Sequence, residues 1–371
     1  MIKLAVIGAS YLQLPLIKKA KEMGIETHCF AWIDGAVCSS IADFFYPISI
    51  LDKDLILEKC KDIGIDGITT IATDMAVPTI SYVAEKMGLL SNSYKSALIS
   101  TDKLEMRKAF SKAGCSIPKF IEVIDRDFNI SDFSFPLIIK PTDRSGSRGV
   151  SKVNSNDELE DAIQYAKKES LSGKILIEEY IEGCEVSVEG VSWKGNHQIL
   201  VITDKITTCS PHFVELAHHQ PSSLCEDIQK VIRQETIKCL NALDIKYGAS
   251  HSEFKITPDG KVFVIEVGAR MGGDFIGSSL VELSTDYDFL KATIDIAIDN
   301  YKFNEKNIVI KRNAGVYFLS KETEKLLPYF EETSEFEVQK EILNNELKFL
   351  TNSNDRSGYF IYKSDVKIDL L

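Results

Sequence analysis

The first hundred residues alternate short apolar runs with amphipathic helical patterns, and this alternation limits the possible folds more than any other feature. Strands are expected at 3–8, 27–32 and 66–74, and helices at 14–24, 54–64 and 79–88. Parallel strands must be joined by crossovers that are long enough to hold a helix. The pattern therefore predicts an α/β unit over residues 1–99, with helices on the faces of a parallel sheet.

This unit resembles a Rossmann-like domain that lacks the dinucleotide fingerprint. No Gly-x-Gly triplet occurs among the 371 residues, so the motif GxGxxG is absent. Gly8 ends the first expected strand, where it either lets a ligand approach the backbone or forms a tight turn.

The pattern changes after a helix expected at 100–114, which begins with an Asp-x-x-Glu capping sequence and ends at a glycine. From residue 118 onward, short β-rich segments dominate. Further helices are expected at 155–168 and 224–243, and further strands at 250–256, 261–267, 314–319 and 358–362. We expect a second, α+β domain over residues 100–300 and a small C-terminal domain over residues 301–371.

Charge and cysteine usage exclude several classes of protein. The formal net charge of -12 works against a general binder of nucleic acid or of an anionic membrane, because such proteins need a basic face. The eight scattered cysteines contain no CxxC pair, which is typical of reduced thiols rather than of a zinc site. No signal-peptide pattern and no apolar stretch of about 18 residues is present. We expect a cytoplasmic protein with no nucleic-acid or membrane partner.

A segment rich in glycine and serine follows Lys140 at the end of an apolar run. Ser145, Gly146, Ser147 and Gly149 leave backbone N–H groups free to converge on phosphate oxygens, and the hydroxyl groups add donors. The segment is not a Walker loop, because GxxxxGK[ST] is absent and a strand follows. Many hairpins contain two glycines, but Lys140 at the strand end favours an anion site.

Glu253 and Glu266 lie on consecutive expected strands that are joined by a tight turn. Antiparallel neighbours with matching inward parity bring two carboxylates close enough for one metal ion, and such oxygen ligands suit Mg²⁺ or Mn²⁺. Without an ion or a cation such as Arg270 between them, the two carboxylates would repel each other. The pair therefore predicts a metal site, with a salt-bridged strand end as the alternative.

In their order along the chain, these motifs resemble the ATP-grasp superfamily over roughly residues 1 to 300. The resemblance is greatest to its carboxylate–amine ligases, biotin carboxylase and the D-alanine–D-alanine ligases. It implies a Rossmann-like N-terminal parallel-sheet domain, an ATP-grasp α+β domain pair and a small C-terminal domain. Within the pair, a nucleotide-clamping subdomain would span about 118–183.

The resemblance also implies an ATP site. The implied nucleotide-binding residues are Lys103, Lys140, Ser145, Gly146, Ser147, Gly149, Glu178, Glu179, Tyr180, Ile181 and Glu185. The two lysines would bind phosphates, the segment 178–181 would meet the adenine, and Glu185 would accept hydrogen bonds from the ribose hydroxyls. Glu253 and Glu266 would hold Mg²⁺ or Mn²⁺, and Arg270 would face the transferred phosphoryl group.

One position departs from the family pattern. The family commonly has Glu-x-Asn at the second metal position, with the asparagine oxygen as a further ligand, and this chain has Gly268 there. Because glycine has no side-chain oxygen, Glu266 would bind bidentately or water would fill the place.

The implied reaction is transfer of the γ-phosphoryl group of ATP to a small-molecule carboxylate, followed by attack of an amine on the acyl phosphate to form an amide. His218 and His219, after Lys205, lie in a stretch that we expect to be a loop-like substrate lid. There a histidine would accept the proton of the amine, and the three residues are the catalytic candidates beside Arg270. Two surface histidines in a polar loop are the alternative.

Two other functions stay open at this point. The same fold could phosphorylate bicarbonate and carboxylate a nitrogen, or loss of metal ligation at Gly268 could leave a non-catalytic ATP-binding module. The assembly state is also open, with a homodimer as one option.

Overall fold

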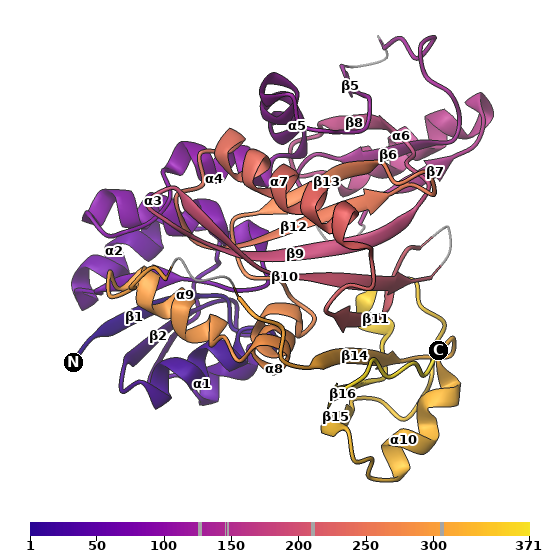
Figure 1. Ribbon diagram of the computed structural model, residues 1–371. Coiled ribbons are helices and arrows are strands. Elements are labelled where there is room, and N and C mark those ends of the chain that lie inside the picture. Colours follow the sequence, from indigo (N-terminus) through magenta and orange to yellow (C-terminus); the bar gives the residue numbers. More distant parts are fainter. Residues whose placement is uncertain (125–127, 145, 147, 209–211, 305–307) are drawn as a thin grey trace.

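Three β-sheets organise the part of the chain that the structure describes (Figure 1). The structure is a computed structural model that describes residues 1–124, 128–144, 146, 148–208, 212–304 and 308–371. Within these residues, no helix is long and apolar enough to cross a membrane.

The N-terminal unit contains a four-stranded parallel sheet with the strand order β3-β2-β1-β4. Its strands are β1 (Lys3–Ile7), β2 (Glu26–Phe30), β3 (Phe44–Tyr46) and β4 (Gly67–Thr69), and its helices are α1 (Leu14–Glu22), α2 (Lys53–Ile63), α3 (Val77–Met87) and α4 (Tyr94–Thr101). The predicted parallel α/β unit is confirmed, because β1 is buried between helices on both faces. The short strand β3 was not predicted.

The helix predicted at 100–114 corresponds to α5 (Lys103–Ala113), and its first two residues belong instead to the end of α4, which was not predicted. Asp102 separates them, because its extended backbone ends α4 and its side chain accepts hydrogen bonds from the N–H groups of Leu104 and Glu105. The predicted capping start is thus confirmed, at the residue that places Lys103 in the first turn of α5.

A small antiparallel sheet, with the order β5-β8-β6-β7, stands apart from the other two in Figure 1 and is called the clamp below. It consists of β5 (Phe120–Val123), β6 (Leu137–Pro141), β7 (Ser151–Val153), β8 (Ile175–Glu179) and the helix α6 (Leu159–Glu169). Ile139, Ile163 and Ile177 are among the residues that form a core of its own between the sheet and α6.

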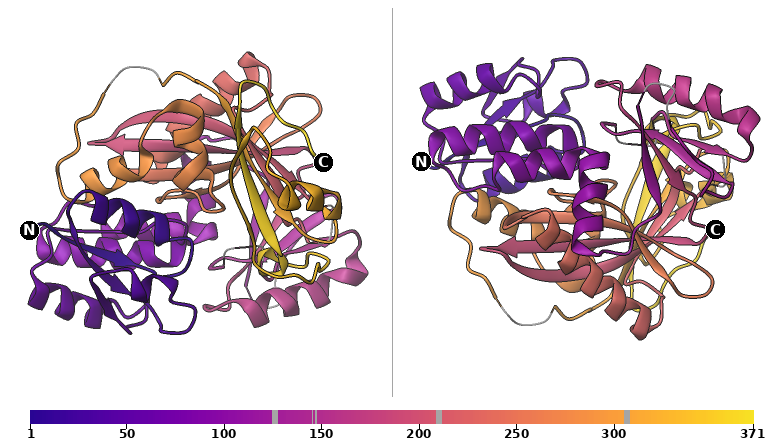
Figure 2. Two further views of the ribbon diagram at one scale, coloured as in Figure 1. Left: turned by 90° about the horizontal axis from the view of Figure 1, so that it is seen from below. Right: turned by 90° about the horizontal axis from the view of Figure 1, so that it is seen from above.

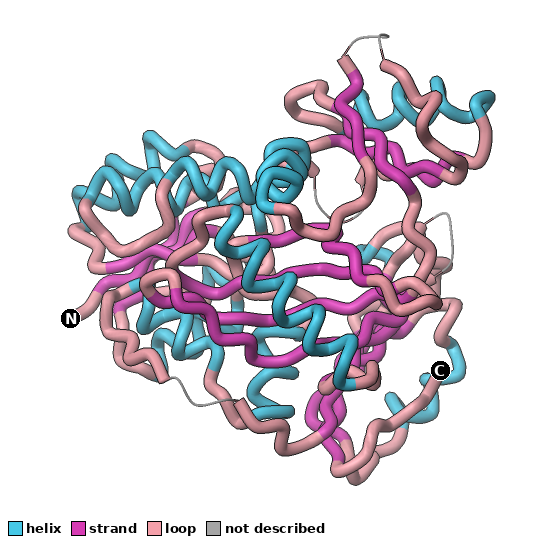
Figure 3. The backbone as a smooth tube through the Cα atoms, turned by 45° about the horizontal axis from the view of Figure 1, so that its top comes forward, coloured by secondary structure: helices cyan, strands magenta, loops and turns pink. Residues whose placement is uncertain are grey.

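The third sheet has eight strands in the order β13-β12-β9-β10-β11-β14-β16-β15. Its strands are β9 (Cys184–Trp193), β10 (Asn196–Thr207), β11 (Glu215–Gln220), β12 (Tyr247–Ile256), β13 (Val262–Gly268), β14 (Asn313–Leu319), β15 (Glu337–Ile342) and β16 (Gly358–Ser364). The remaining helices are α7 (Glu226–Ala242), α8 (Val281–Thr285), α9 (Phe289–Ala297) and α10 (Leu327–Glu331). Helix α7 covers one face of this sheet (Figure 3). The C-terminal strands pair with β11, so the last part of the chain extends the large sheet.

Single-turn helices complete the chain. These are η1 (Val37–Ser40), η2 (Asp74–Ala76), η3 (Asn156–Glu158), the π-type η4 (Ile276–Leu280), η5 (Glu324–Leu326) and η6 (Ser353–Asp355). The prediction that His218 and His219 lie in a loop-like lid is wrong, since both belong to β11, which pairs with β10 and β14 and is largely buried.

Helix α9 joins the N-terminal unit to the large sheet. Phe289 and Ile294 belong to one buried core with residues of β1 and β12. An ideal Cβ on Gly67 of β4 would lie 2.5 Å from the carbonyl oxygen of Ala297, so this close approach requires glycine. Both views in Figure 2 show the N-terminal unit and the clamp on the same side of the large sheet.

Candidate active site

Lys103 links α5 to the edge of the large sheet. Its Nζ lies 2.8 Å from Oε1 of Glu266 and donates to the carbonyl oxygen of Arg144 at 2.6 Å. Burial by itself lowers the pKa of Lys103, but Glu266 outweighs burial and the pKa is above its ordinary value. The lysine therefore carries a positive charge beside a predicted metal ligand.

Glu178 of the clamp bridges two cations, Arg107 on α5 and Lys140 on β6. Its carboxylate lies 2.5 Å from Nε of Arg107 and 2.5 Å from Nζ of Lys140, and all three side chains are nearly inaccessible to solvent. Burial raises the pKa of Glu178, but the two cations outweigh burial and hold it below its usual range. Burial also lowers the pKa of Lys140. The carboxylate predicted to meet the adenine therefore holds Lys140 in place. Arg107 was missed, although it follows Lys103 by four residues on the same face of α5.

A cavity of about 220 Å³ lies between the clamp and the large sheet. It is lined by Lys103, Pro118, Ile138, Lys140, Arg144, Gly146, Val150, Glu178, Glu179, Tyr180, Ile181, Glu185, Lys205, Phe213, Glu215, Glu253, Lys255, Ile265 and Glu266. Apolar side chains form one part of this wall, and lysines and carboxylates form the other. The cavity thus offers an apolar surface for a planar ring beside charged groups for phosphates.

The predicted phosphate loop is only partly described. Gly146 lines the cavity, whereas Ser145 and Ser147 lie outside the described residues. Gly149 has φ +74°, and a Cβ there would lie 2.9 Å from Cβ of Glu169. This glycine is therefore required by the turn itself, whatever the loop binds.

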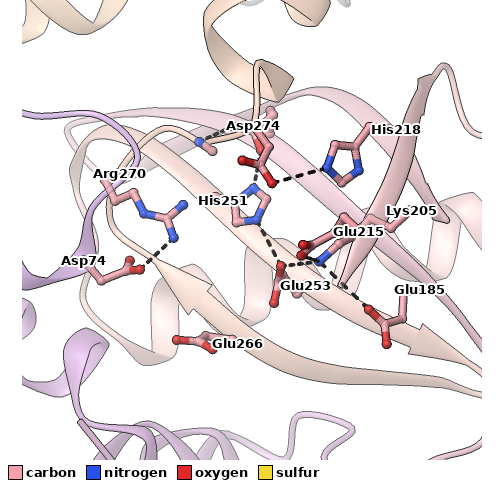
Figure 4. A network of polar contacts seen from close by, with 12 residues as sticks. Asp74, Glu185, Lys205, Glu215, His218, His251, Glu253, Glu266, Arg270 and Asp274 are labelled. Atoms are coloured by element: carbon pink, nitrogen blue, oxygen red, sulfur yellow. Dashed lines mark hydrogen bonds and ion pairs between the residues drawn. The ribbon is translucent and has the colours of Figure 1, made fainter. Parts of the chain in front are cut away.

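Lys205 is surrounded by carboxylates (Figure 4). Its Nζ lies 2.6 Å from Glu253, 3.5 Å from Glu215 and 3.9 Å from Glu185. Burial lowers the pKa of Lys205, but the carboxylates outweigh burial and raise it above the ordinary value. Glu185 is shared with Lys255 at 3.1 Å. The predicted catalytic lysine is thus a fixed, buried cation next to the predicted ribose and metal ligands.

Glu253 and Glu266 face each other directly across β12 and β13, and both line the cavity. Burial raises the pKa of Glu253, but Lys205 and His251 hold it well below its usual range. Each carboxylate is paired with a lysine, Glu253 with Lys205 and Glu266 with Lys103. Two carboxylates on one face fit a hard divalent cation such as Mg²⁺ or Mn²⁺, which both lysines would flank.

A buried pair behind Glu253 was missed. Glu189 is inaccessible to solvent, contacts Nδ1 of His251 and accepts a hydrogen bond from the N–H group of Gly272 at 3.0 Å. The other ring nitrogen of His251 lies 3.4 Å from Glu253. Burial lowers the pKa of His251, but Glu189 outweighs it and the pKa is raised to about 9. Alternation along β9 and β12 could have revealed both residues, since Glu185 and Glu189, like His251 and Glu253, share strand parity.

Arg270 pairs with Asp74 of the N-terminal unit at 2.7 Å. The two segments are tied together, because Ile71 forms a parallel bridge with Met271 and the N–H group of Ala72 donates to its carbonyl at 3.0 Å. An ideal Cβ on Gly268 would lie 2.5 Å from Oδ1 of Asp74. The Asp74 carboxylate therefore occupies the space that a side chain at position 268 would need.

The two predicted histidines point in opposite directions from β11. His218 lies on the side of the site, with Nε2 3.9 Å from Asp274, and its buried ring nitrogens lack a hydrogen-bond partner within the described chain. Burial lowers the pKa of His218, so the ring is neutral near pH 7. His219 instead bonds to the hydroxyl of Tyr362 at 2.9 Å and packs in the C-terminal core. The structure thus brings His218, and not His219, to the site.

His219 leads to a prediction about stability. Burial lowers its pKa from 6.5 to about 4, so the unfolded chain binds the proton more readily between these values. The stability that comes from keeping the ring neutral is complete above pH 6.5 and is lost as the pH falls towards 4. When the pH is lowered from 7 to 5, the free energy of unfolding should fall in both proteins, as measured by urea unfolding. The fall should be about 2 kcal/mol larger in wild type than in a His219→Gln variant, because glutamine does not titrate. Equal drops would contradict this.

Arg356 was also missed, because no local pattern marks it. It lies 2.8 Å from Asp274 and 2.9 Å from Glu215, and its guanidinium stacks 3.7 Å from the ring centroid of Phe318. The residue precedes β16, so the C-terminal segment contributes a buried cation close to His218 and Lys205.

Comparison with known proteins shows similarity in sequence and in fold. Residues 133–278 match a family model described as an ATP-grasp domain. Alanine–anticapsin ligase of Bacillus subtilis (strain 168) is 27% identical over 271 residues, which cover 63% of this chain and 57% of that protein. The chain thus spans less than two thirds of the length of this curated relative.

Two solved structures have a similar fold. The L-amino acid ligase from Bacillus licheniformis superposes with a TM-score of 0.81 at 21% identity, covering 99% of this chain and 94% of that one. The ADP complex of N5-carboxyaminoimidazole synthetase from Staphylococcus aureus superposes with a TM-score of 0.80 at 17% identity, covering 100% and 94%. At these identities the likeness concerns the fold.

Proposed function

The chain contains an ATP-grasp domain, and on this premise we propose that the protein is an ATP-dependent carboxylate–amine ligase that forms an amide through an acyl phosphate. The relatives named above are ligases and a synthetase by name, which supports the reaction class. The thiols of the seven described cysteines are free, which supports the predicted cytoplasmic location.

One observation carries the proposal. Glu253 and Glu266 face each other in the lining of a cavity that Lys140 also lines, and Lys103 and Lys205 pair with these two carboxylates. A polyphosphate needs several converging cations and a divalent ion, whereas a simple apolar ligand would need none of them. Bound Mg²⁺ or Mn²⁺ would neutralise phosphate charge.

The residues of the chain then divide the work. Lys103 and Lys140 bind phosphate oxygens, and Glu178 keeps Lys140 aligned through the ion pair at 2.5 Å. Tyr180 and Ile181 supply backbone and apolar contacts for the base. Arg270, held by Asp74, orients the substrate carboxylate for phosphoryl transfer.

His218 is the proposed acceptor of the proton that the attacking amine loses. Its neutral ring lies beside Asp274, which would stabilise the imidazolium form at 3.9 Å. Arg356 and Glu215 frame the same region and could select the second substrate. The names of the relatives favour amino acids as substrates. Arg356 and Glu215 are therefore the first residues to mutate when substrate specificity is studied.

The proposal is tested by supplying ATP and Mg²⁺ with pairs from a panel of amino acids. ADP and an amide product, identified by mass spectrometry, are expected only when both an acid and an amine are present. A bicarbonate arm tests the carboxylase alternative, because ADP formation that depends on bicarbonate alone would replace the proposal. Tight ATP binding with no turnover for any pair would favour the non-catalytic module.

Glu266→Gln is expected to lower turnover by about 10²–10³-fold, because the variant loses one anionic ligand and the ion pair of Lys103. Mn²⁺ binding in the presence of ADP, followed by electron paramagnetic resonance, should weaken in parallel. Glu282→Gln, at an exposed carboxylate outside the cavity lining, is the control. Unchanged Mn²⁺ binding in Glu266→Gln would remove this residue from the metal site.

A further inference from the structure

Two cysteines that are far apart in the sequence meet a glutamate where α5 ends against α7. Cys115 follows Gly114, the residue that closes α5. Glu235 and Cys239 are four residues apart on α7, so they share the helix face that packs against α5. The two Sγ atoms and one carboxylate oxygen all lie within 4.8 Å of one another, and no other such group of three occurs in the described ranges.

The surroundings separate this group from the ATP site. Cys115 and Cys239 are buried in the core that packs α7 on the large sheet, among apolar residues such as Phe110 and Leu240. Glu235 reaches from this core to the surface, since 17% of its side chain is exposed. It accepts a hydrogen bond from the N–H group of Ser116 at 3.0 Å, which fixes its carboxylate beside the thiols.

We propose that Cys115, Glu235 and Cys239 form a binding site for a thiophilic divalent cation of the Zn²⁺ class. Bonds of about 2.3 Å to sulfur and 2.0–2.2 Å to oxygen place tetrahedral ligand atoms about 3.5–3.8 Å apart, so the observed group needs only a small contraction. Both thiols release their protons on binding, and water takes the fourth position from the exposed side of Glu235. Sulfur ligands distinguish this site from the all-oxygen pair Glu253 and Glu266.

The proposed metal ion would be balanced in charge by a neighbouring lysine and would stabilise α5. Two thiolates and a carboxylate around a divalent cation leave one net negative charge. Lys238, whose Nζ lies 3.3 Å from Glu235, would neutralise it. The ion would join the end of α5 to α7. Because α5 carries Lys103 and Arg107, this bond would stabilise the helix that supports the phosphate end of the cavity.

The probe is Cd²⁺, whose thiolate complexes absorb in the ultraviolet. The protein would carry Ser at Cys184 and Cys225, the exposed thiols, and at Cys209, which lies outside the described residues. We expect one equivalent of Cd²⁺ to produce the thiolate charge-transfer band, with release of two protons, and Zn²⁺ to compete for the site. Zn²⁺ should also raise the melting temperature.

Matched variants decide the outcome. Cys239→Ala should abolish the band. Glu235→Gln should weaken Cd²⁺ binding by at least about 10–100-fold, which is the cost of removing a residue that only hydrogen-bonds to a metal ligand. Cys60→Ala, at an equally buried thiol in the N-terminal unit, should leave binding unchanged. Circular dichroism checks that each variant is folded, and Cys115→Ser provides a second test if Cys239→Ala unfolds. A missing band in the parent protein, or a band that survives in folded Cys239→Ala, would overturn the proposal.

Discussion

Glu178→Gln is expected to lower the free energy of unfolding by about 3–5 kcal/mol, which is the usual cost of removing one member of a buried ion pair. The carboxylate is 3% exposed and lies between Arg107 and Lys140. Glutamine keeps the size of the side chain but leaves two buried cations without an anion. Equilibrium unfolding in urea at pH 7 measures the change.

The neighbouring residue supplies the control for this experiment. Glu179 ends the same strand with its side chain exposed, so Glu179→Gln should change the free energy of unfolding by less than about 0.5 kcal/mol. A second readout is the KM for ATP, which should rise in Glu178→Gln because Lys140 loses the partner that aligns it. Equal stability of the two variants would show that Arg107 and Lys140 find other partners or water.

Gly268→Ala is expected to lower turnover by about 10²–10³-fold, even though it adds a single methyl group. A Cβ at this position would lie 2.5 Å from Oδ1 of Asp74 and 3.2 Å from Cζ of Arg270. The methyl group must therefore displace the Asp74 carboxylate and break its 2.7 Å ion pair with Arg270. Steady-state kinetics with the substrates identified by the ligation assay measure the effect.

A double-mutant cycle identifies the cause. Asp74→Ala removes the clashing oxygen, so Gly268→Ala should cost much less in that background, with a coupling free energy of about 1–3 kcal/mol. Gly268→Asn with Asp74→Ala is expected to recover still more activity, because its amide oxygen can accept a hydrogen bond from Arg270. Additive effects of the two single changes would mean that Asp74 and position 268 do not share this space.

Much of the architecture could be predicted from the sequence because it depends on local patterns. Periodicity gave the parallel N-terminal sheet, α7 and the β12–β13 hairpin, and strand parity gave the facing pair Glu253 and Glu266. The polar composition of β11 led to the wrong prediction of a loop. The segment is a buried strand because β10 and β14 supply hydrogen-bond partners for its backbone.

The candidate site was only partly predictable, for a physical reason. Lys103, Lys140, Glu253 and Glu266 lie at strand or helix positions that a motif can mark, and all four line one cavity. Their partners come from distant segments: Arg107 joins Glu178, Asp74 joins Arg270, and Arg356 joins Asp274. Ion pairs between distant segments leave no pattern in a single sequence.

Spacing along the chain was enough to predict the parallel N-terminal sheet, the β12–β13 hairpin and the order of the charged motifs. Which charges meet could be read only from the folded structure, because burial and pairing depend on segments up to hundreds of residues apart. The tertiary structure made Gly268 the space for Asp74, turned His218 and His219 to opposite faces, and brought Cys115 to Cys239. The spacing of the cysteines gave no sign of that last meeting, because the fold and not the sequence sets their distance.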